Sequence, residues 1–232
     1  MAKERKTKQY ELTDILLALL ASKLRKEVNR LDVMGFDELS APNVTKLTKA
    51  MIERLLKDNK QAFLKIAKEA TEEASEDVQA IGVPAKPIPV DGDYVDGVLG
   101  EYNPVTNYLY YPEADRKRSR LVEAILTAVA INSRNDYHKE LKKFANLWHT
   151  QTKQYGETMV DKTRLDTFEK NGIKYVMWQT QGDEKVCSEC RDRNGKIYPL
   201  SEYPGKAHYN CRCWLVPVLN KEGSNGERRT NE

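Results

Sequence analysis

The chain has 232 residues, enough for one substantial domain or two modest ones with a real core. Hydrophobic residues make up 40% and charged residues 31%, a balance typical of globular proteins with much exposed helix, and the net charge of +3 is too small to indicate nucleic-acid binding. No secretory signal is visible, and the longest uncharged apolar run, ILLALLAS at residues 15–22, is far shorter than the roughly 20 residues of a spanning helix. We therefore expect a protein that is neither exported by a standard signal nor held in a membrane.

Residues 1–81 are predicted to form an N-terminal helical hairpin or bundle. Asn43 is a predicted N-cap of its second helical stretch, which runs to about residue 79, either unbroken or with a break at residues 58–59. In the first stretch, residues 10–34, apolar side chains recur at steps of three and four, which places them on one helix face. These apolar positions are Leu12, Ile15, Leu16, Leu19, Leu24, Val28 and Leu31.

Residues 82–103 are predicted to be a linker that contains proline and glycine. The run IGVPAKPIPVDGD brings three prolines close together, which favours an extended, semi-rigid connector. The following DGDYVDG has acidic residues at alternate positions, as calcium loops do. Counted from Asp91, however, the loop's glycine position holds Asp96 and its glutamate position holds Tyr102. We therefore interpret DGDYVDG as a surface turn.

Residues 104–172 are predicted to be a second helical block. An apolar stripe runs from Leu121 to Trp148, as one long helix or as two joined near residues 132–136. A further helical segment is expected at about residues 158–170, and the pair Asn171-Gly172 is a good C-cap that should end it.

Residues 173–219 change to the alternation typical of strands. IKYVMWQ, KIYPL and CRCWLVPV are strand candidates, and Asn194-Gly195 is a tight-turn signal. The polar residues 220–232 are predicted to be a disordered tail. The predicted fold class is α+β, a mainly helical body with a small C-terminal β-rich zinc-knuckle module.

All four cysteines of the chain lie in this module, with one histidine between the two pairs. The pattern is C-x2-C-x17-H-x2-C-x-C, formed by Cys187, Cys190, His208, Cys211 and Cys213. Two thiolates separated by two residues can face one ion across a tight knuckle, and a second pair of ligands completes a tetrahedron. We predict a structural zinc ion held by four of these five residues. The fourth ligand beside Cys187, Cys190 and His208 is either cysteine of the second pair, and an all-cysteine site is the alternative.

Other interpretations of the cysteines find less support. The missing secretory signal disfavours disulfides, and a redox CxxC normally opens a helix within a βαβ unit, for which no pattern exists here. A zinc deaminase needs a glutamate two residues after the ligating histidine, and His208, the histidine between the two cysteine pairs, is followed at that position by Asn210. Thiolate-rich ligation closed by four side chains also disfavours a catalytic zinc, so we predict a structural ion and identify no catalytic residues.

Several residues around the cysteines together resemble the C-terminal signature of the Mu F-like minor head proteins, the head-morphogenesis proteins of tailed phages. The resemblance covers about residues 173–219. It rests on Trp178, Thr180, Asp183, Cys187, Cys190, Gly195, His208, Asn210, Cys211, Arg212, Cys213 and Pro217, which occur in the family's order and spacing.

The resemblance implies that the protein is not an enzyme but a minor capsid protein that associates with the portal during procapsid assembly. Its partners would be the portal protein and other capsid proteins, with contact to packaged double-stranded DNA as a further expectation. Its location would be the interior of the virion capsid, and the host cytoplasm during assembly. The basic clusters MAKERKTK, RKRSR at residues 116–120 and RR at residues 228–229 suit DNA contact but do not demand it.

Two alternative functions remain open at this point. A zinc-binding, nucleic-acid-binding protein would need a basic face, against which the small net charge argues. A nuclease of the His-Asn-His type would need several histidines near the metal, whereas His208 is the single histidine in this part of the sequence.

Overall fold

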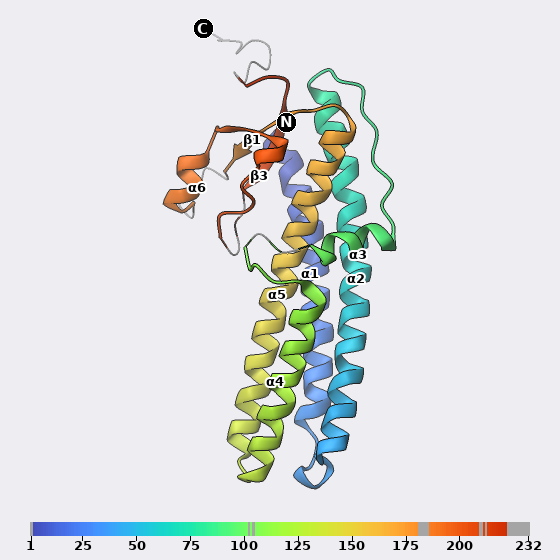
Figure 1. Cartoon of the computed structure of the whole chain (residues 1–232), viewed down its shortest axis with the longest axis vertical. Coiled ribbons are helices and arrows are strands. Elements are labelled where there is room, and N and C mark those ends of the chain that lie inside the picture. Colours follow the sequence, from blue (N-terminus) through green and yellow to red (C-terminus); the bar gives the residue numbers. More distant parts are fainter. Residues whose placement is uncertain are drawn as a thin grey trace. The chain divides into compact units, whose positions relative to one another are not determined.

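The computed structural model describes residues 2–101, 103, 105–180, 186–208, 211 and 213–221, with side chains from residue 13 onward. The chain divides into two compact units, Met1–Lys65 with Gly92–Gly156 and Ile66–Asp91 with Glu157–Glu232. The elements are α1 (Ala2–Asp32), η1 (Phe36–Glu38), α2 (Ala41–Ala80), α3 (Gly92–Gly100), α4 (Tyr110–Ala130), α5 (Arg134–Lys170), β1 (Tyr175–Gln179), α6 (Ser188–Arg193), β2 (Ile197–Pro199), η2 (Leu200–Glu202) and β3 (Trp214–Val218). Figure 1 shows the helices and the small sheet.

The first unit is a helical bundle of α1, α4 and the adjoining parts of α2 and α5 (Figure 1). Each of these helices contributes to one apolar core, for example Leu31, Leu55, Ile125 and Leu141. Short connections join α1 to α2 and α4 to α5, as is usual for antiparallel neighbours in a bundle.

The buried face of α1 differs from the predicted stripe. Ile15 and Leu19 are 58% and 55% exposed, whereas the alternate leucines Leu17 and Leu20 are buried together with Leu16. The reason lies in the run ILLALL, whose apolar residues occupy more than one side of a helix. Periodicity within such a run cannot choose the face that the neighbouring helices cover.

The start and continuity of α2 also depend on tertiary contacts. The helix begins at Ala41 and Val44 N–H donates to the Ser40 carbonyl, so Asn43 lies inside the first turn and its predicted N-cap role is wrong. The helix does not break at residues 58–59. There the buried Asn59 Nδ2 donates to Tyr110 Oη at 2.7 Å and to Thr152 Oγ1 at 2.9 Å, which ties the centre of α2 to α4 and α5.

The second helical block consists of two helices. Residues 131–133 separate α4 from α5, with Asn132 in the left-handed region at φ 51° and Ser133 Oγ donating to Asp136 Oδ2 at 2.7 Å. The segment predicted at residues 158–170 is the end of the same α5. It stops where predicted, since Gly172 has a φ of 78° that favours glycine.

DGDYVDG is helical, so the predicted surface turn is wrong. It forms most of α3, whose Val95, Val98 and Leu99 are buried. Asp96 accepts hydrogen bonds from Lys60 Nζ at 2.6 Å and Tyr111 Oη at 2.7 Å. These contacts from α2 and α4 stabilise a short helix that its own sequence, with three glycines, would not hold.

The second unit carries the β-rich module. Its three-stranded antiparallel sheet has the order β2-β1-β3, with Met177 opposite Ile197 on one side and Val216 on the other. Val176 and Leu215 pack with Phe168 of α5 and Val78 of α2 into one core. The predicted α+β class, a mainly helical body with a small C-terminal sheet beside a Cys/His cluster, is confirmed.

Candidate metal centre

The first cysteine pair stands at the start of α6. Cys187 is the N-cap of this helix, and its Sγ accepts the backbone N–H of Cys190 at 3.4 Å. This hydrogen bond forms the tight knuckle expected of C-x2-C, because the N-cap side chain satisfies a donor of the first turn. The knuckle turns both sulfurs to the same side.

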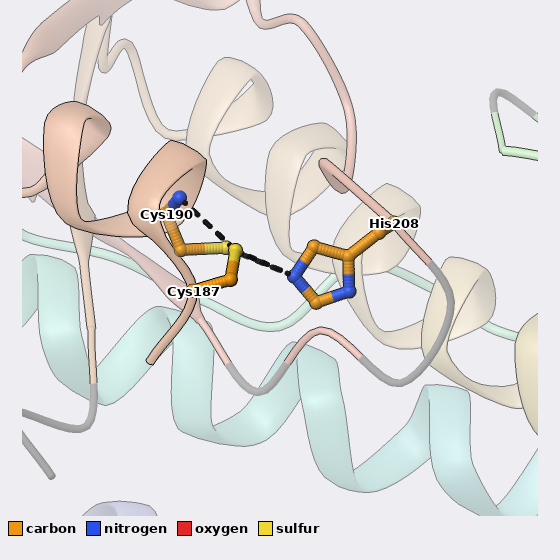
Figure 2. Close-up of side chains that lie close together, drawn as sticks. All are labelled: Cys187, Cys190 and His208. Carbon is orange, nitrogen blue, oxygen red and sulfur yellow. Dashed lines mark hydrogen bonds between the residues drawn. The ribbon is translucent and has the colours of Figure 1, made fainter. Parts of the chain in front are cut away.

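His208 reaches this knuckle from the loop that precedes β3. Its Nε2 lies 3.1 Å from Cys187 Sγ and 3.3 Å from Cys190 Sγ (Figure 2). In Figure 2 the imidazole of His208 points directly at the two sulfurs from the opposite side. The structure therefore brings together three of the predicted ligands, although His208 follows Cys190 by 18 positions.

The second cysteine pair joins the same cluster through Cys190. Cys190 Sγ lies 3.5 Å from Cys211 Sγ, and the ligand atoms of Cys190, Cys211 and Cys213 all lie within 4.8 Å of one another. The ligand atoms of Cys187, Cys190 and His208 satisfy the same limit. Cys190 thus belongs to both groups, and every predicted ligand contributes to one continuous cluster.

Aromatic and aliphatic groups enclose the sulfurs. Trp178 of β1 is completely buried and packs with Cys190, Cys211 and Cys213. The Arg193 guanidinium lies 5.0 Å from the centre of the Trp178 ring, on its face. The cluster therefore has a largely apolar boundary, which excludes water and lowers the local dielectric constant.

The thiol pKa values reflect this crowding. Burial raises the pKa of Cys190 to about 12. A hydrogen bond from Cys213 lowers the pKa of Cys211 to about 4, and the same bond raises the pKa of Cys213. The backbone N–H of Cys190 lowers the pKa of Cys187. Neighbouring thiols thus compete for protons, and a divalent cation that bound them would displace those protons and hold the sulfurs as thiolates.

The donor set fits a metal ion. Sulfur and imidazole nitrogen are the donors that zinc prefers, and tetrahedral Zn–S bonds of about 2.3 Å place two sulfurs about 3.8 Å apart. The Cys190 to Cys211 separation of 3.5 Å is close to this value. The Cys187, Cys190, His208, Cys211 and Cys213 cluster could therefore bind a metal ion.

Comparison with known protein families then places this part of the chain. Residues 126–216 match the family described as Phage Mu protein F like protein. We call residues 126–216 the Mu F-like region. The match confirms the resemblance and begins well upstream of residue 173, so that it takes in all of α5 as well as the cysteine module. Comparisons with curated proteins and with solved structures gave no match.

The Mu F-like region contains a buried polar group that the sequence analysis did not identify. Lys206, two residues before His208, lies beside Asp161 of α5 with Nζ 3.3 Å from Oδ1, and it donates to the Cys213 carbonyl. Tyr203 Oη donates to Asp161 Oδ2 at 3.0 Å. One signal for this group was present in the sequence. The helical period of α5 places Asp161 among buried residues, and a buried carboxylate needs a partner.

Arg164 is a second residue of the Mu F-like region that sequence reasoning missed. Its side chain is 3% exposed, and it donates to Asp77 of α2 and, at 3.0 Å, to the Leu215 carbonyl of β3. Its guanidinium also lies over the Phe168 ring, 5.3 Å from the centre. One buried cation thus joins two helices and the sheet of the second unit.

Other residues singled out in the sequence lie apart from the cluster or outside the described residues. Asp183, Asn210 and Arg212 of the signature, and the basic pair at residues 228–229, fall outside the described residues. His138 Nδ1 contacts Asp32 Oδ1 within the first unit. His149 is exposed on α5.

The basic run RKRSR lies on α4, where acidic neighbours compensate much of its charge. Arg116 and Lys117 both pair with Glu113, and Arg118 pairs with Asp115.

Across the described part of the chain, every helix is too short or too polar to cross a membrane.

Proposed function

We propose that the protein is a non-enzymatic minor component of a phage head that associates with the portal during procapsid assembly. The observation that carries this proposal is the Mu F-like region, because that family is one of head-morphogenesis proteins. Its partners are then the portal and other capsid proteins, and its location is the capsid interior after assembly in the host cytoplasm. Contact with packaged DNA stays a prediction.

The metal in this proposal is a structural zinc ion. Its ligands are Cys187, Cys190, His208 and Cys211, since Cys190 Sγ is in contact with both His208 Nε2 and Cys211 Sγ. Cys213 serves as a hydrogen-bond donor to the Cys211 sulfur. Four protein ligands, three of them thiolates, leave no coordination position for water and damp the acidity of the ion. Such an ion holds the module together and supplies no chemistry to a substrate.

A groove between α4 and α5 in the first unit supports a protein partner. Its volume is about 730 Å³, with Leu121, Ala128 and Phe144 among the residues that line it. Two more lining residues, Ile131 and Leu147, are 61% and 49% exposed. Large exposed apolar side chains beside a groove are typical of a surface that another protein covers.

The charges of the groove favour a protein over DNA. Both helices bring charges of both signs to the groove, with Arg116 and Glu113 on α4 and Lys143 and Glu140 on α5. A DNA backbone would require one sign of charge along its path. A groove with both signs and exposed apolar residues fits an amphipathic segment of the portal better than a DNA backbone.

The test is incorporation into phage particles. Purified procapsids and virions, analysed by immunoblot and quantitative mass spectrometry, should contain the protein, and procapsids assembled without the portal should lack it. Absence from wild-type particles would overturn the proposal.

A groove variant separates docking from folding. Ile131→Asp combined with Leu147→Asp should keep the zinc content and the helical circular dichroism of wild type but fall at least tenfold in procapsids. The matched control is Val33→Asp, which changes an apolar residue that is 83% exposed and does not line the groove. This variant should incorporate normally. Equal incorporation of both variants would remove the groove from the proposal.

A further inference from the structure

We propose that Lys206 is a positioning residue of the metal centre and its buried counter-charge, shared between the Asp161 carboxylate and the Cys211 thiolate. The inference rests on the proposed zinc site and adds to it a specific requirement for a cation outside the ligand set.

The first step is the placement of the ammonium group. The Lys206 side chain is 5% exposed, and its Nζ donates to the backbone carbonyl of Cys213 and lies 3.3 Å from Asp161 Oδ1. Lysine is among the residues least often buried, because removing its charge from water is costly unless an anion compensates it. Here the burial places a positive charge directly against the segment that carries Cys211 and Cys213.

The second step is the orientation of the group. Asp161 belongs to α5, whereas Lys206 lies in the loop that precedes β3. Its second carboxylate oxygen accepts the Tyr203 hydroxyl at 3.0 Å, so both oxygens are engaged from the loop side. Asp161 therefore holds Lys206 from one side, and Lys206 holds the Cys213 carbonyl from the other. The loop residues on either side of His208 are thereby set against α5.

The third step is the balance of charge. A zinc ion with three thiolates and one imidazole has a net charge of −1, and Asp161 adds a second buried negative charge beside it. Lys206 is the cation that contacts both parts of this arrangement, through Asp161 and through the Cys213 carbonyl. Two buried negative charges repel each other, and the positive charge of Lys206, which is paired with Asp161 and held against the segment of Cys211 and Cys213, offsets that repulsion.

This role differs from that of a mechanical support in one measurable way. If Lys206 only tied the loop to α5, removal of either end of the tie would loosen the metal ligands equally. If it acts by charge, removal of the lysine leaves two buried anions together, whereas neutralisation of Asp161 leaves the full positive charge to the thiolate. Lys206→Met and Asp161→Asn should then have different effects on metal affinity.

The experiment measures zinc affinity by chelator competition on the full chain. Lys206→Met should weaken binding about 10- to 100-fold, the usual effect of losing a residue that supports a metal ligand. Asp161→Asn should stay within about threefold of wild type, and the double variant should bind more tightly than Lys206→Met alone. Lys206→Arg should retain most of the affinity because it keeps the charge. Lys196→Met, which changes an exposed lysine of the same unit, is the matched control and should bind as wild type does.

A spectroscopic readout covers the case in which Lys206→Met folds poorly. The measurement uses cobalt in place of zinc. Loss of the Lys206 cation in Lys206→Met raises the energy of the thiolate electrons, so the thiolate-to-cobalt charge-transfer band of this variant should move to longer wavelength than in wild type. Lys206→Arg should keep the band of wild type, and Lys206→Gln, which retains a donor for the Cys213 carbonyl, should still show the shift.

The outcomes are distinct. Wild-type affinity in Lys206→Met, or an equal loss in Lys206→Met and Asp161→Asn, would overturn the role of Lys206 while leaving the zinc site intact. A wild-type protein that binds neither zinc nor cobalt would overturn the site and this inference together.

Discussion

Cys190 Sγ lies 3.5 Å from Cys211 Sγ, although 21 positions separate the two residues in the chain. This contact joins the knuckle at the start of α6 to the segment that leads into β3. Because Cys190 also contacts His208, the two halves of the cysteine pattern share one residue. Cys190 is therefore the residue through which the two groups of candidate ligands form one cluster.

The first prediction distinguishes Cys211 from Cys213. Cys211→Ser should reduce bound zinc from about one ion per chain to a small fraction, because it removes a ligand. Cys213→Ser should keep about one ion per chain, since a hydroxyl can still donate to the Cys211 sulfur. Native mass spectrometry of the two variants gives the stoichiometry directly. The reverse result would assign Cys213 as the ligand, and retention of zinc by Cys190→Ser would rule out the site.

The second prediction concerns the buried cation Arg164. Arg164→Met should lower the free energy of unfolding by about 3–5 kcal/mol, because it leaves the partly buried Asp77 carboxylate and the Leu215 carbonyl without this donor. The control is Lys143→Met, which removes an exposed partner of Glu140 and should lower the free energy of unfolding by no more than about 0.5 kcal/mol. Urea denaturation followed by circular dichroism provides both values. A loss below 1 kcal/mol for Arg164→Met would contradict the role given to this residue.

The third prediction is a pH dependence that arises at Glu73. Burial raises the pKa of this carboxyl group from its ordinary value near 4.5 to about 7, against the opposing effect of Arg164. Between these two pH values the folded state binds more protons than the unfolded state, so the free energy of unfolding falls as the pH rises. Glu73→Gln should remove this decrease in the free energy of unfolding. The free energy of unfolding of the variant should equal that of wild type at pH 4 and exceed it by about 1 kcal/mol or more at pH 8.

The measurement is the difference between the two unfolding free energies at each pH, which cancels the pH dependence of metal binding common to both proteins. Glu202→Gln, at an exposed position of the same unit, serves as the control and should show no such difference. A Glu73→Gln advantage that is constant with pH would show that the carboxylate does not titrate in this range.

Local signals in the sequence identified the elements of the cysteine module. The tight-turn pair Asn194-Gly195 lies where the structure has a glycine φ of 78°, and the pair Asn171-Gly172 lies where α5 ends. Both are properties of neighbouring residues, as is the knuckle from Cys187 to Cys190. Such features could be read without knowing what packs against them.

Features that depend on distant partners could not be read in this way. Whether α1 buries Leu17 or Leu19 depends on which side its neighbours cover, and the helicity of α3 depends on the contacts of Asp96 with Lys60 and Tyr111. The pairing of Lys206 with Asp161 could not be predicted either, because the two residues belong to separate elements and their spacing matches no helix or strand period.

By itself, the sequence determined that this chain carries a Cys/His cluster in a β-rich module behind long helices, because ligand spacing, strand alternation and turn residues are written within a few positions of one another. Only the tertiary structure decided that Cys190 links both ligand groups and that Lys206 and Asp161 are buried beside them. The physical reason is that burial and charge compensation are set by residues brought together from separate elements, and these contacts exist only once α5 and the sheet have packed.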